Sequence, residues 1–181
     1  MFDSIFPFTF LMSKYENNPT FHIKTYLYKI ETTAGKYLVH LEKYIRDTYV
    51  VKFYPVRFKK YPGKFQMISH DNVMQGVVST ALQIFVQHLV RNPRASLGFI
   101  ASASIIGSFK EKQPNNQRFR IYRQVMENLF GSITFAHFCD ITNSAYLMAN
   151  KLNDMGEYVN EMQTVFSQLY PEMFNLHFTE I

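Results

Sequence analysis

Three segments in the first third of the chain alternate between apolar and polar side chains. Such alternation is typical of half-buried β-strands, because successive side chains of a strand point to opposite faces. The positions predicted to share a buried face are Tyr26, Tyr28 and Ile30, then Tyr37, Val39 and Leu41, then Tyr49, Val51 and Phe53. The connecting segments 32–35 and 45–47 are short enough for hairpins. The pattern therefore predicts an antiparallel meander, with Lys64–Ile68 as an optional fourth short strand.

The spacing of apolar residues changes to that of a helix after this meander. The segment Asn72–Val90 repeats apolar residues at helical intervals, with Ser69 or Asp71 as a cap and Asn92-Pro93 as the stop. The elements predicted after it are a strand at Ser96–Ser102 buried on both faces, a helix at Arg118–Phe130, short strands at Ile133–Cys139 and Ser144–Met148, and a helix at Asp154–Leu169. The tail from Met173 onward is expected to pack as an edge strand or to bind a partner.

This order predicts a single α+β domain over residues 1–181. Its parts are an N-terminal segment (1–20), an α+β core (21–150) and a C-terminal amphipathic helix and tail (151–181). A strand–helix–strand crossover joined to a meander gives a mixed sheet with helices on its faces. The hydrophobic fraction of 47% excludes a disordered chain, and the single Cys excludes an intramolecular disulfide framework and a Cys-rich zinc site.

Charge is distributed unevenly along the chain. The formal net charge is +5, but residues 21–64 hold ten basic and three acidic side chains, whereas Lys151 alone opposes seven acidic side chains after residue 124. Such asymmetry suggests a surface for a protein partner or self-association, although solvated faces would also explain it.

The apolar N-terminus does not look like a signal peptide, because Asp3 stands where Lys or Arg is needed. The uncharged run Ala95–Phe109 is shorter than the ~20 residues of a membrane-spanning helix. We therefore expect a cytoplasmic protein of a prokaryotic kind that does not interact with a membrane.

Two segments carry a resemblance to a known family. Val73–Val78 reads VMQGVV and Asn115–Tyr122 reads NNQRFRIY. With the predicted order of elements over residues 25–150, they resemble the second half of the GNAT acetyltransferase fold. In that family a Gln/Arg-x-x-Gly-x-Gly/Ala turn opens the first helix, and its N–H groups hold the pyrophosphate of coenzyme A. Gly76 matches this motif, whereas Val73 and Val78 depart from it.

The second motif of the family is Asn-x-x-Ala-x-x-Leu-Tyr. Asn115, Ile121 and Tyr122 match it, and Arg118 replaces the small residue. The resemblance implies that Asn115 orients the thioester and that Tyr122 protonates the departing thiolate. The segment 74–122 is also similar to small uncharacterised bacterial proteins that pair a VVST-type helix with an R-x-R/L-Y-R helix.

Two groups of basic residues are candidate binding sites. Arg118, Arg120 and Arg123 surround Tyr122 near a helix start, where guanidinium and N–H groups can hold phosphate or carboxylate. They could equally be solvated helix residues. A second group, interleaved with Phe and Tyr, is typical of a nucleic-acid surface but also of a strand with one charged face. Its members are Lys52, Arg57, Lys59, Lys60 and Lys64.

Other catalytic motifs are missing from the sequence. The six His residues lack metal-ligand spacing, so no metal site is expected. His137 and Cys139 share one strand face, where Cys139 is expected to be a small buried side chain. Asp71, after His70, is better explained as a helix cap than as a catalytic group.

The leading hypothesis is a non-catalytic interaction module of a bacterial regulatory, toxin–antitoxin or defence-type system that needs no cofactor. The alternatives are a GNAT-like N-acyltransferase that uses acetyl-CoA, and a nucleic-acid-binding protein. One observation distinguishes the first two. A V-shaped cleft between the strand ending near Ile68 and the strand at Leu97–Ala101 would suit an acyl donor, whereas a cleft filled by Phe or Tyr would favour a binding module.

Overall fold

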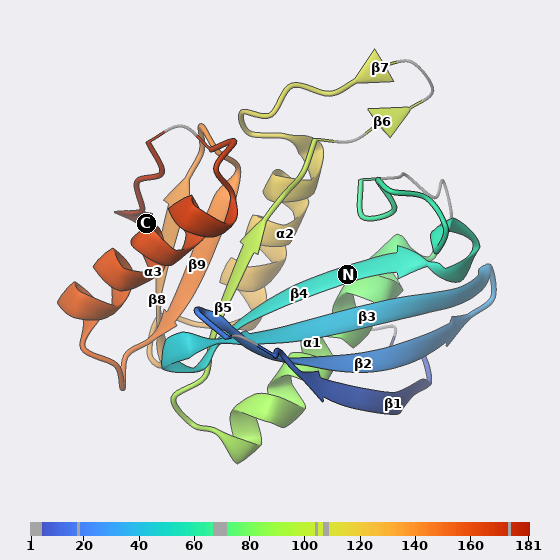
Figure 1. Ribbon diagram of the computed structural model, residues 1–181, viewed down its shortest axis with the longest axis horizontal. Coiled ribbons are helices and arrows are strands. Elements are labelled where there is room, and N and C mark those ends of the chain that lie inside the picture. Colours follow the sequence, from blue (N-terminus) through green and yellow to red (C-terminus); the bar gives the residue numbers. More distant parts are fainter. Residues whose placement is uncertain (1–4, 18, 67–71, 104, 107–108, 174) are drawn as a thin grey trace.

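A computed structural model of the protein describes residues 5–17, 19–66, 72–103, 105–106, 109–173 and 175–181 (Figure 1). It is an α+β fold with an eight-stranded mixed sheet in the order β1-β2-β3-β4-β5-β9-β8-β10. The strands of this sheet are β1 (Phe8–Tyr15), β2 (His22–Thr32), β3 (Gly35–Tyr44), β4 (Thr48–Pro55), β5 (Ser96–Ile100), β8 (Phe135–Asp140), β9 (Ala145–Asn150) and β10 (Thr179–Glu180). The helices are α1 (Met74–Arg91), α2 (Gln117–Leu129) and α3 (Met155–Leu169). A separate small hairpin pairs β6 (Ile105–Ile106) with β7 (Phe109–Lys110).

The meander forms with the predicted register. β1 to β4 pair in sequence order, each antiparallel to the next. The predicted inward positions all belong to one hydrophobic core, and Tyr28, Ile30, Tyr37, Val39, Leu41 and Tyr49 are buried there. The period of two therefore identified the correct face of every meander strand from β2 to β4.

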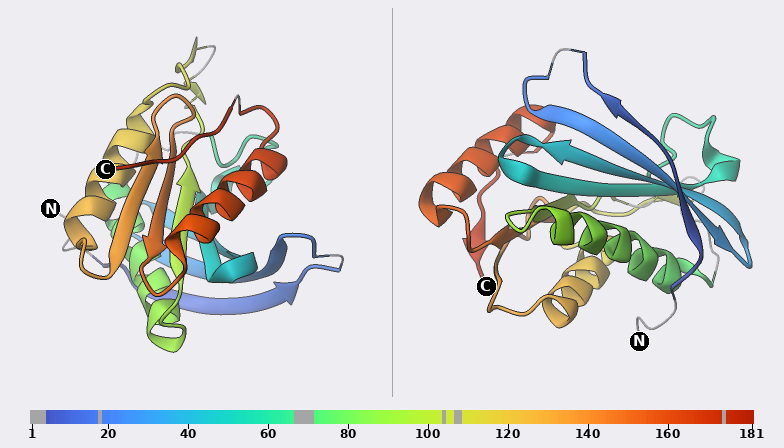
Figure 2. Two further views of the ribbon diagram at one scale, coloured as in Figure 1. Left: turned by 90° about the vertical axis from the view of Figure 1, so that its left-hand side faces the viewer. Right: turned by 90° about the horizontal axis from the view of Figure 1, so that it is seen from below.

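The two faces of the sheet carry different helices. Figure 2 shows α1 and α2 on one face and α3 on the other. The first core joins α1 and α2 to the meander and β5, and Phe85 and Phe119 are among its fully buried residues. The second core joins α3 to β8, β9 and the C-terminal tail, and Tyr158 and Phe166 are buried in it. Since helices or the tail cover both faces there, β5, β8 and β9 are almost entirely buried.

The sheet departs from the prediction at two places and agrees with it at the C-terminal tail. Residues 8–15 of the N-terminal segment form edge strand β1, which the alternation pattern did not reveal. Lys64–Gln66 lie in turns instead of the optional fourth strand, and Ile68 lies outside the described residues, as do the proposed caps Ser69 and Asp71. The C-terminal tail does form an edge strand, because β10 pairs with β8.

No helix in the described part of the chain is both long and apolar enough to cross a membrane.

One histidine lies inside the first core. His88 of α1 is 5% exposed, and its Nε2 lies 2.8 Å from the hydroxyl oxygen of Tyr28. Burial and the nearby cations Arg91, Lys24 and Lys43 lower the pKa of His88 to about 4. The folded protein therefore favours the neutral imidazole, whereas the unfolded chain binds a proton near pH 6.5. This difference stabilises the fold above pH 6.5 and is lost as the pH falls toward 4.

We predict that His88→Gln will weaken the loss of stability in acid. Between pH 7 and pH 5 the free energy of unfolding should fall by about 2 kcal/mol less in the variant than in the wild type. Urea unfolding at both pH values measures the difference. His177→Gln, which changes an exposed side chain, should keep the wild-type pH dependence. An equal loss of unfolding free energy in His88→Gln and in the wild type would contradict the lowered pKa of His88.

Candidate functional site

The parallel strands β4 and β5 pair over only three residues each. The pairs are Thr48 with Ser96, Tyr49 with Leu97, and Val50 with Gly98. Beyond Val50 and Gly98 the strands diverge, and the V between them is visible in Figure 1. Backbone N–H and C=O groups on the two facing edges therefore lose their ladder partners, and need water or a ligand instead.

A cleft of about 680 Å³ opens where these strands diverge, which is a typical volume for a ligand pocket. Lys52 and Phe53 of β4 both line it, although successive side chains of a strand point to opposite faces. Its other walls include the start of α1 at Met74, residues of α2, and Tyr170 and Glu172 after α3. The cleft thus reaches both faces of the sheet.

Two amide side chains hold the chain that follows β5. Gln113 accepts a hydrogen bond from Ala103 N (3.1 Å), and its Nε2 donates to the carbonyls of Ala101 and Asn143 (3.0 Å each). Asn116 caps α2 by accepting from Phe119 N (3.0 Å), and its Nδ2 also donates to the Ala101 carbonyl. These contacts fix one wall of the cleft relative to α2.

Tyr122 of α2 lies where the cleft meets the first core. Its ring packs against Phe53 and Phe99, with centroid separations of 6.1 and 5.5 Å. Burial raises the pKa of Tyr122, and the nearby Arg118 only partly opposes this shift. The phenol therefore stays protonated at neutral pH and can donate a proton or a hydrogen bond into the cleft.

A buried carboxylate lies near the α3 side of the cleft. Glu42 of β3, 9% exposed, forms an ion pair with Lys52 Nζ (2.7 Å) and accepts a hydrogen bond from the Tyr44 hydroxyl (2.7 Å). Burial alone would lower the pKa of Lys52, but Tyr170 and Glu42 raise it above its usual value. Lys52 thus stays charged and brings one cation to the cleft wall, with its charge partly balanced by Glu42.

Gly76 and Asn115, the two residues that the family resemblance assigns to coenzyme A binding, lie in different environments. Gly76 lies in the first turn of α1 and is buried against Phe6, such that a Cβ at this position would lie 2.4 Å from the ring. Asn115 is exposed, has a positive φ of 50°, and does not line the cleft. Asn116, the next residue, is the one that faces inward, and it is 1% exposed.

The three arginines of α2 do not converge on one site. Arg118 lines the cleft and donates hydrogen bonds to the carbonyls of Phe65 and Gln66, so it bridges α2 to the segment after β4. Arg120 is exposed and donates to the Asn115 carbonyl. Arg123 pairs with Glu127 (2.7 Å) and lies near Cys139, away from the cleft.

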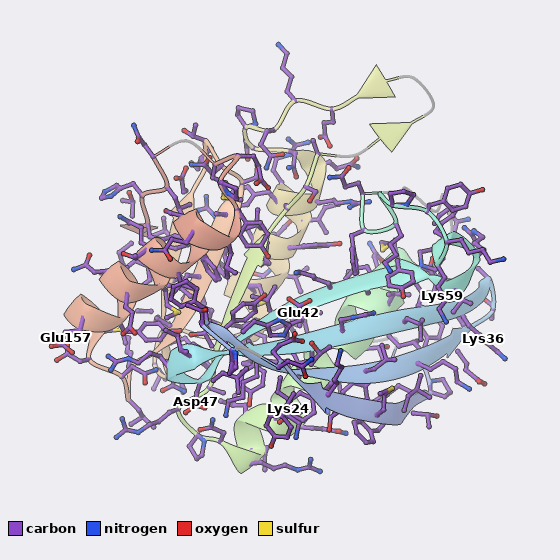
Figure 3. All side chains as sticks on the ribbon, in the orientation of Figure 1. Lys24, Lys36, Glu42, Asp47, Lys59 and Glu157 are labelled. Atoms are coloured by element: carbon purple, nitrogen blue, oxygen red, sulfur yellow. The ribbon has the colours of Figure 1, made fainter. Side chains whose placement is uncertain are left out.

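The five basic residues between positions 52 and 64 are also dispersed. Lys52 lies in the cleft, and Lys64 lies 4.7 Å from the Tyr54 ring centroid. Arg57 packs against Phe58, and Lys60 is exposed. Lys59 is at the outer end of the meander, the same end as Lys36 and far from Glu42 (Figure 3). Nucleic-acid binding by this segment stays a prediction.

His137 and Cys139 do share one face of β8, as expected. Both are buried, and burial raises the pKa of the Cys139 thiol. His137 Nδ1 lies 2.5 Å from the Tyr146 hydroxyl. Within the described residues there is no group of three or more His, Cys, Asp or Glu that could hold a metal ion.

Comparison of the chain with models of protein families, with curated proteins and with solved structures finds no match.

We predict that Asn116→Ala will destabilise the protein by about 2 kcal/mol, because α2 loses its cap and the Ala101 carbonyl loses a donor. Asn128→Ala is the matched control, since Asn128 is exposed on the same helix and should cost less than about 0.5 kcal/mol. Chemical denaturation measures both values. Equal losses of stability in the two variants would contradict the role of Asn116 as the cap of α2 and as a donor to the Ala101 carbonyl.

Proposed function

We propose that the cleft between β4 and β5 binds an acyl-coenzyme A thioester and that the protein transfers the acyl group to an amine. The observation that carries this proposal is the separation of the two strands after three residue pairs. The resulting cleft keeps a volume of about 680 Å³ although five Phe and Tyr residues line it, and this volume supports an acyl donor over a pure binding module.

The order of elements supports the proposal. A four-stranded antiparallel meander is followed by α1, by β5 parallel to β4, by α2, and by a hairpin whose second strand pairs with β5. This order resembles the second half of the GNAT fold, in which the acyl donor lies in the V between two diverging strands. GNAT-like topology is therefore part of the proposal.

The backbone of the cleft suits an extended ligand that contains amides. The facing edges of β4 and β5 offer N–H and C=O groups that no longer pair with each other. The pantetheine arm of coenzyme A carries two amides that can satisfy such groups. Val73 at the N-cap of α1 makes no side-chain hydrogen bond, and the N–H groups at a helix N-terminus are suited to a phosphate. Because Phe6 covers Gly76, that phosphate would contact the turn through N–H groups and not through the Gly76 Cα.

Tyr122 is the group proposed to act as acid. The amine nitrogen attacks the thioester carbonyl, a C–N bond forms, and the C–S bond breaks. The thiolate takes the proton of the Tyr122 phenol, and the amine releases one proton to water. Water then returns a proton to the phenolate, so the net products are an amide and free coenzyme A. The raised pKa of Tyr122 keeps its proton available at neutral pH.

Isothermal titration with acetyl-CoA tests binding, and we expect a micromolar dissociation constant. Tyr122→Phe should keep that affinity and reduce turnover by about 100-fold, because the leaving thiolate loses its acid. Turnover is measured as thiol release from acetyl-CoA with a panel of small primary amines. Tyr61→Phe, at an exposed position, is the control and should behave as wild type. Absence of binding, or unchanged turnover in Tyr122→Phe, would reject the corresponding part of the proposal.

A second candidate function is protein–protein interaction through edge strand β1, and the partner we favour is a second copy of the chain. Large apolar side chains of this strand are exposed, with Phe10 at 52% and Met12 at 53%. The free side of an edge strand also offers unpaired backbone groups to another strand. This candidate corresponds to the interaction module that the sequence analysis favoured. A protein could dimerise through β1 and also transfer an acyl group in the cleft.

We predict that sedimentation velocity at tens of micromolar protein will show a dimer in the wild type and a monomer in Met12→Lys. The substitution places a charge in the strand-to-strand contact. Val90→Lys replaces another exposed apolar residue, 78% exposed on α1, and should leave the dimer intact. A wild-type monomer, or a dimer insensitive to Met12→Lys, would eliminate the second candidate.

A further inference from the structure

A small apolar pocket adjoins the cleft on the side of α1 and α2. Its volume is about 40 Å³. Three residues line both the pocket and the cleft, namely Val51, Phe53 and Tyr122. The two spaces therefore share a wall that includes Tyr122, the residue proposed to face the thioester sulfur.

The residues that line the pocket are all apolar apart from Tyr122. Its remaining walls include Val78, Ala81 and Leu82 of α1, Leu97 and Phe99 of β5, and Met126 of α2. All six are buried. A buried water molecule typically makes two to four hydrogen bonds, and the apolar side chains of this pocket offer no such partners. An aliphatic group is the ligand class that these walls favour.

The volume limits the length of such a group. A single water-sized group needs roughly 10–15 Å³ of a cavity, so the pocket has room for about three of them. The chain beyond the carbonyl carbon of a butyryl group has three carbons, whereas that of an acetyl group has one. A butyryl tail fills the pocket, an acetyl group leaves most of it unused, and an octanoyl tail exceeds it.

We propose that the acyl group handled by this protein is a short aliphatic chain of about four carbons, whose tail lies in the apolar pocket beside Tyr122. This inference rests on the proposed function, since it names the acyl donor of the same cleft. The pocket lies between α1, α2 and the diverging strands, so chain length is selected mainly by residues of α1, α2 and β5 that do not line the cleft.

The test compares the binding of free coenzyme A, acetyl-CoA, butyryl-CoA and octanoyl-CoA by isothermal titration. Each buried methylene contributes to affinity, and we expect butyryl-CoA to bind about tenfold more tightly than acetyl-CoA. Octanoyl-CoA should bind more weakly than butyryl-CoA, because its tail does not fit.

Two variants examine the pocket directly. Ala81→Leu fills it and should abolish the preference for butyryl-CoA while leaving acetyl-CoA binding within about twofold. Val78→Ala enlarges it and should shift the preference toward hexanoyl-CoA, which keeps the test decisive if Ala81→Leu does not fold. Val125→Ala is the matched control, since Val125 is a fully buried valine of α2 that does not line the pocket. It should keep the wild-type order of affinities.

The outcomes separate the two proposals. Equal affinity for acetyl-CoA and butyryl-CoA, with binding intact, would overturn the acyl-chain pocket and leave the proposed function standing. No binding of any thioester or of free coenzyme A would overturn the proposed function, and the pocket assignment with it. A chain-length preference that Val78→Ala and Val125→Ala change equally would also overturn the pocket assignment.

Discussion

The short pairing between β4 and β5 is the constraint on which the rest of the structure depends. Three residue pairs join the meander to the remaining four strands, and the last pair ends at Gly98. Glycine is needed there because a Cβ would lie 2.7 Å from the Phe166 ring of α3. That ring is fully buried in the second core. The position where the strands part is thus fixed by packing from the face opposite α1 and α2.

This arrangement gives the cleft two chemically different mouths. On the side of α1 and α2 it is bordered by rings and aliphatic side chains that belong to the first core. On the side of α3 it is bordered by Lys52, Tyr170 and Glu172, with the buried Glu42 behind Lys52. An apolar group and a polar group can therefore enter the cleft from opposite faces of the sheet.

The sequence was sufficient to predict the elements whose burial is periodic. Alternate residues of β2, β3 and β4 and the apolar positions of α1 pack in the first core, so local spacing identified both the elements and their inward faces. β1 was missed because it is an exposed edge strand interrupted by a bulge between Phe10 and Met12, and it has no alternating buried face. The segment 64–68 was expected only as an optional strand, and the turns that follow Pro62 extend through Gln66.

The site was less accessible to sequence reasoning than the fold. The family motif pointed to Asn115, yet the structure turns Asn116 inward, and a shift of one residue cannot be seen without the backbone conformation. Asn is a residue type favoured at helix N-caps, and this is the signal that could have identified Asn116. Gln113 left no such signal, because its partners Ala101 and Asn143 are brought to it only by tertiary folding. The three arginines shared a segment of sequence but point to different surroundings.

The bridge made by Arg118 has a mechanical consequence. Its two hydrogen bonds join α2 to the segment after β4, so they connect the two halves of the sheet on the far side of the cleft from the three strand pairs. The bridge adds to the three strand pairs, to the contact of Thr48 with Tyr158 and to the hydrophobic cores that the two halves share. Widening the cleft on this side would therefore require the two hydrogen bonds of Arg118 to the Phe65 and Gln66 carbonyls to break.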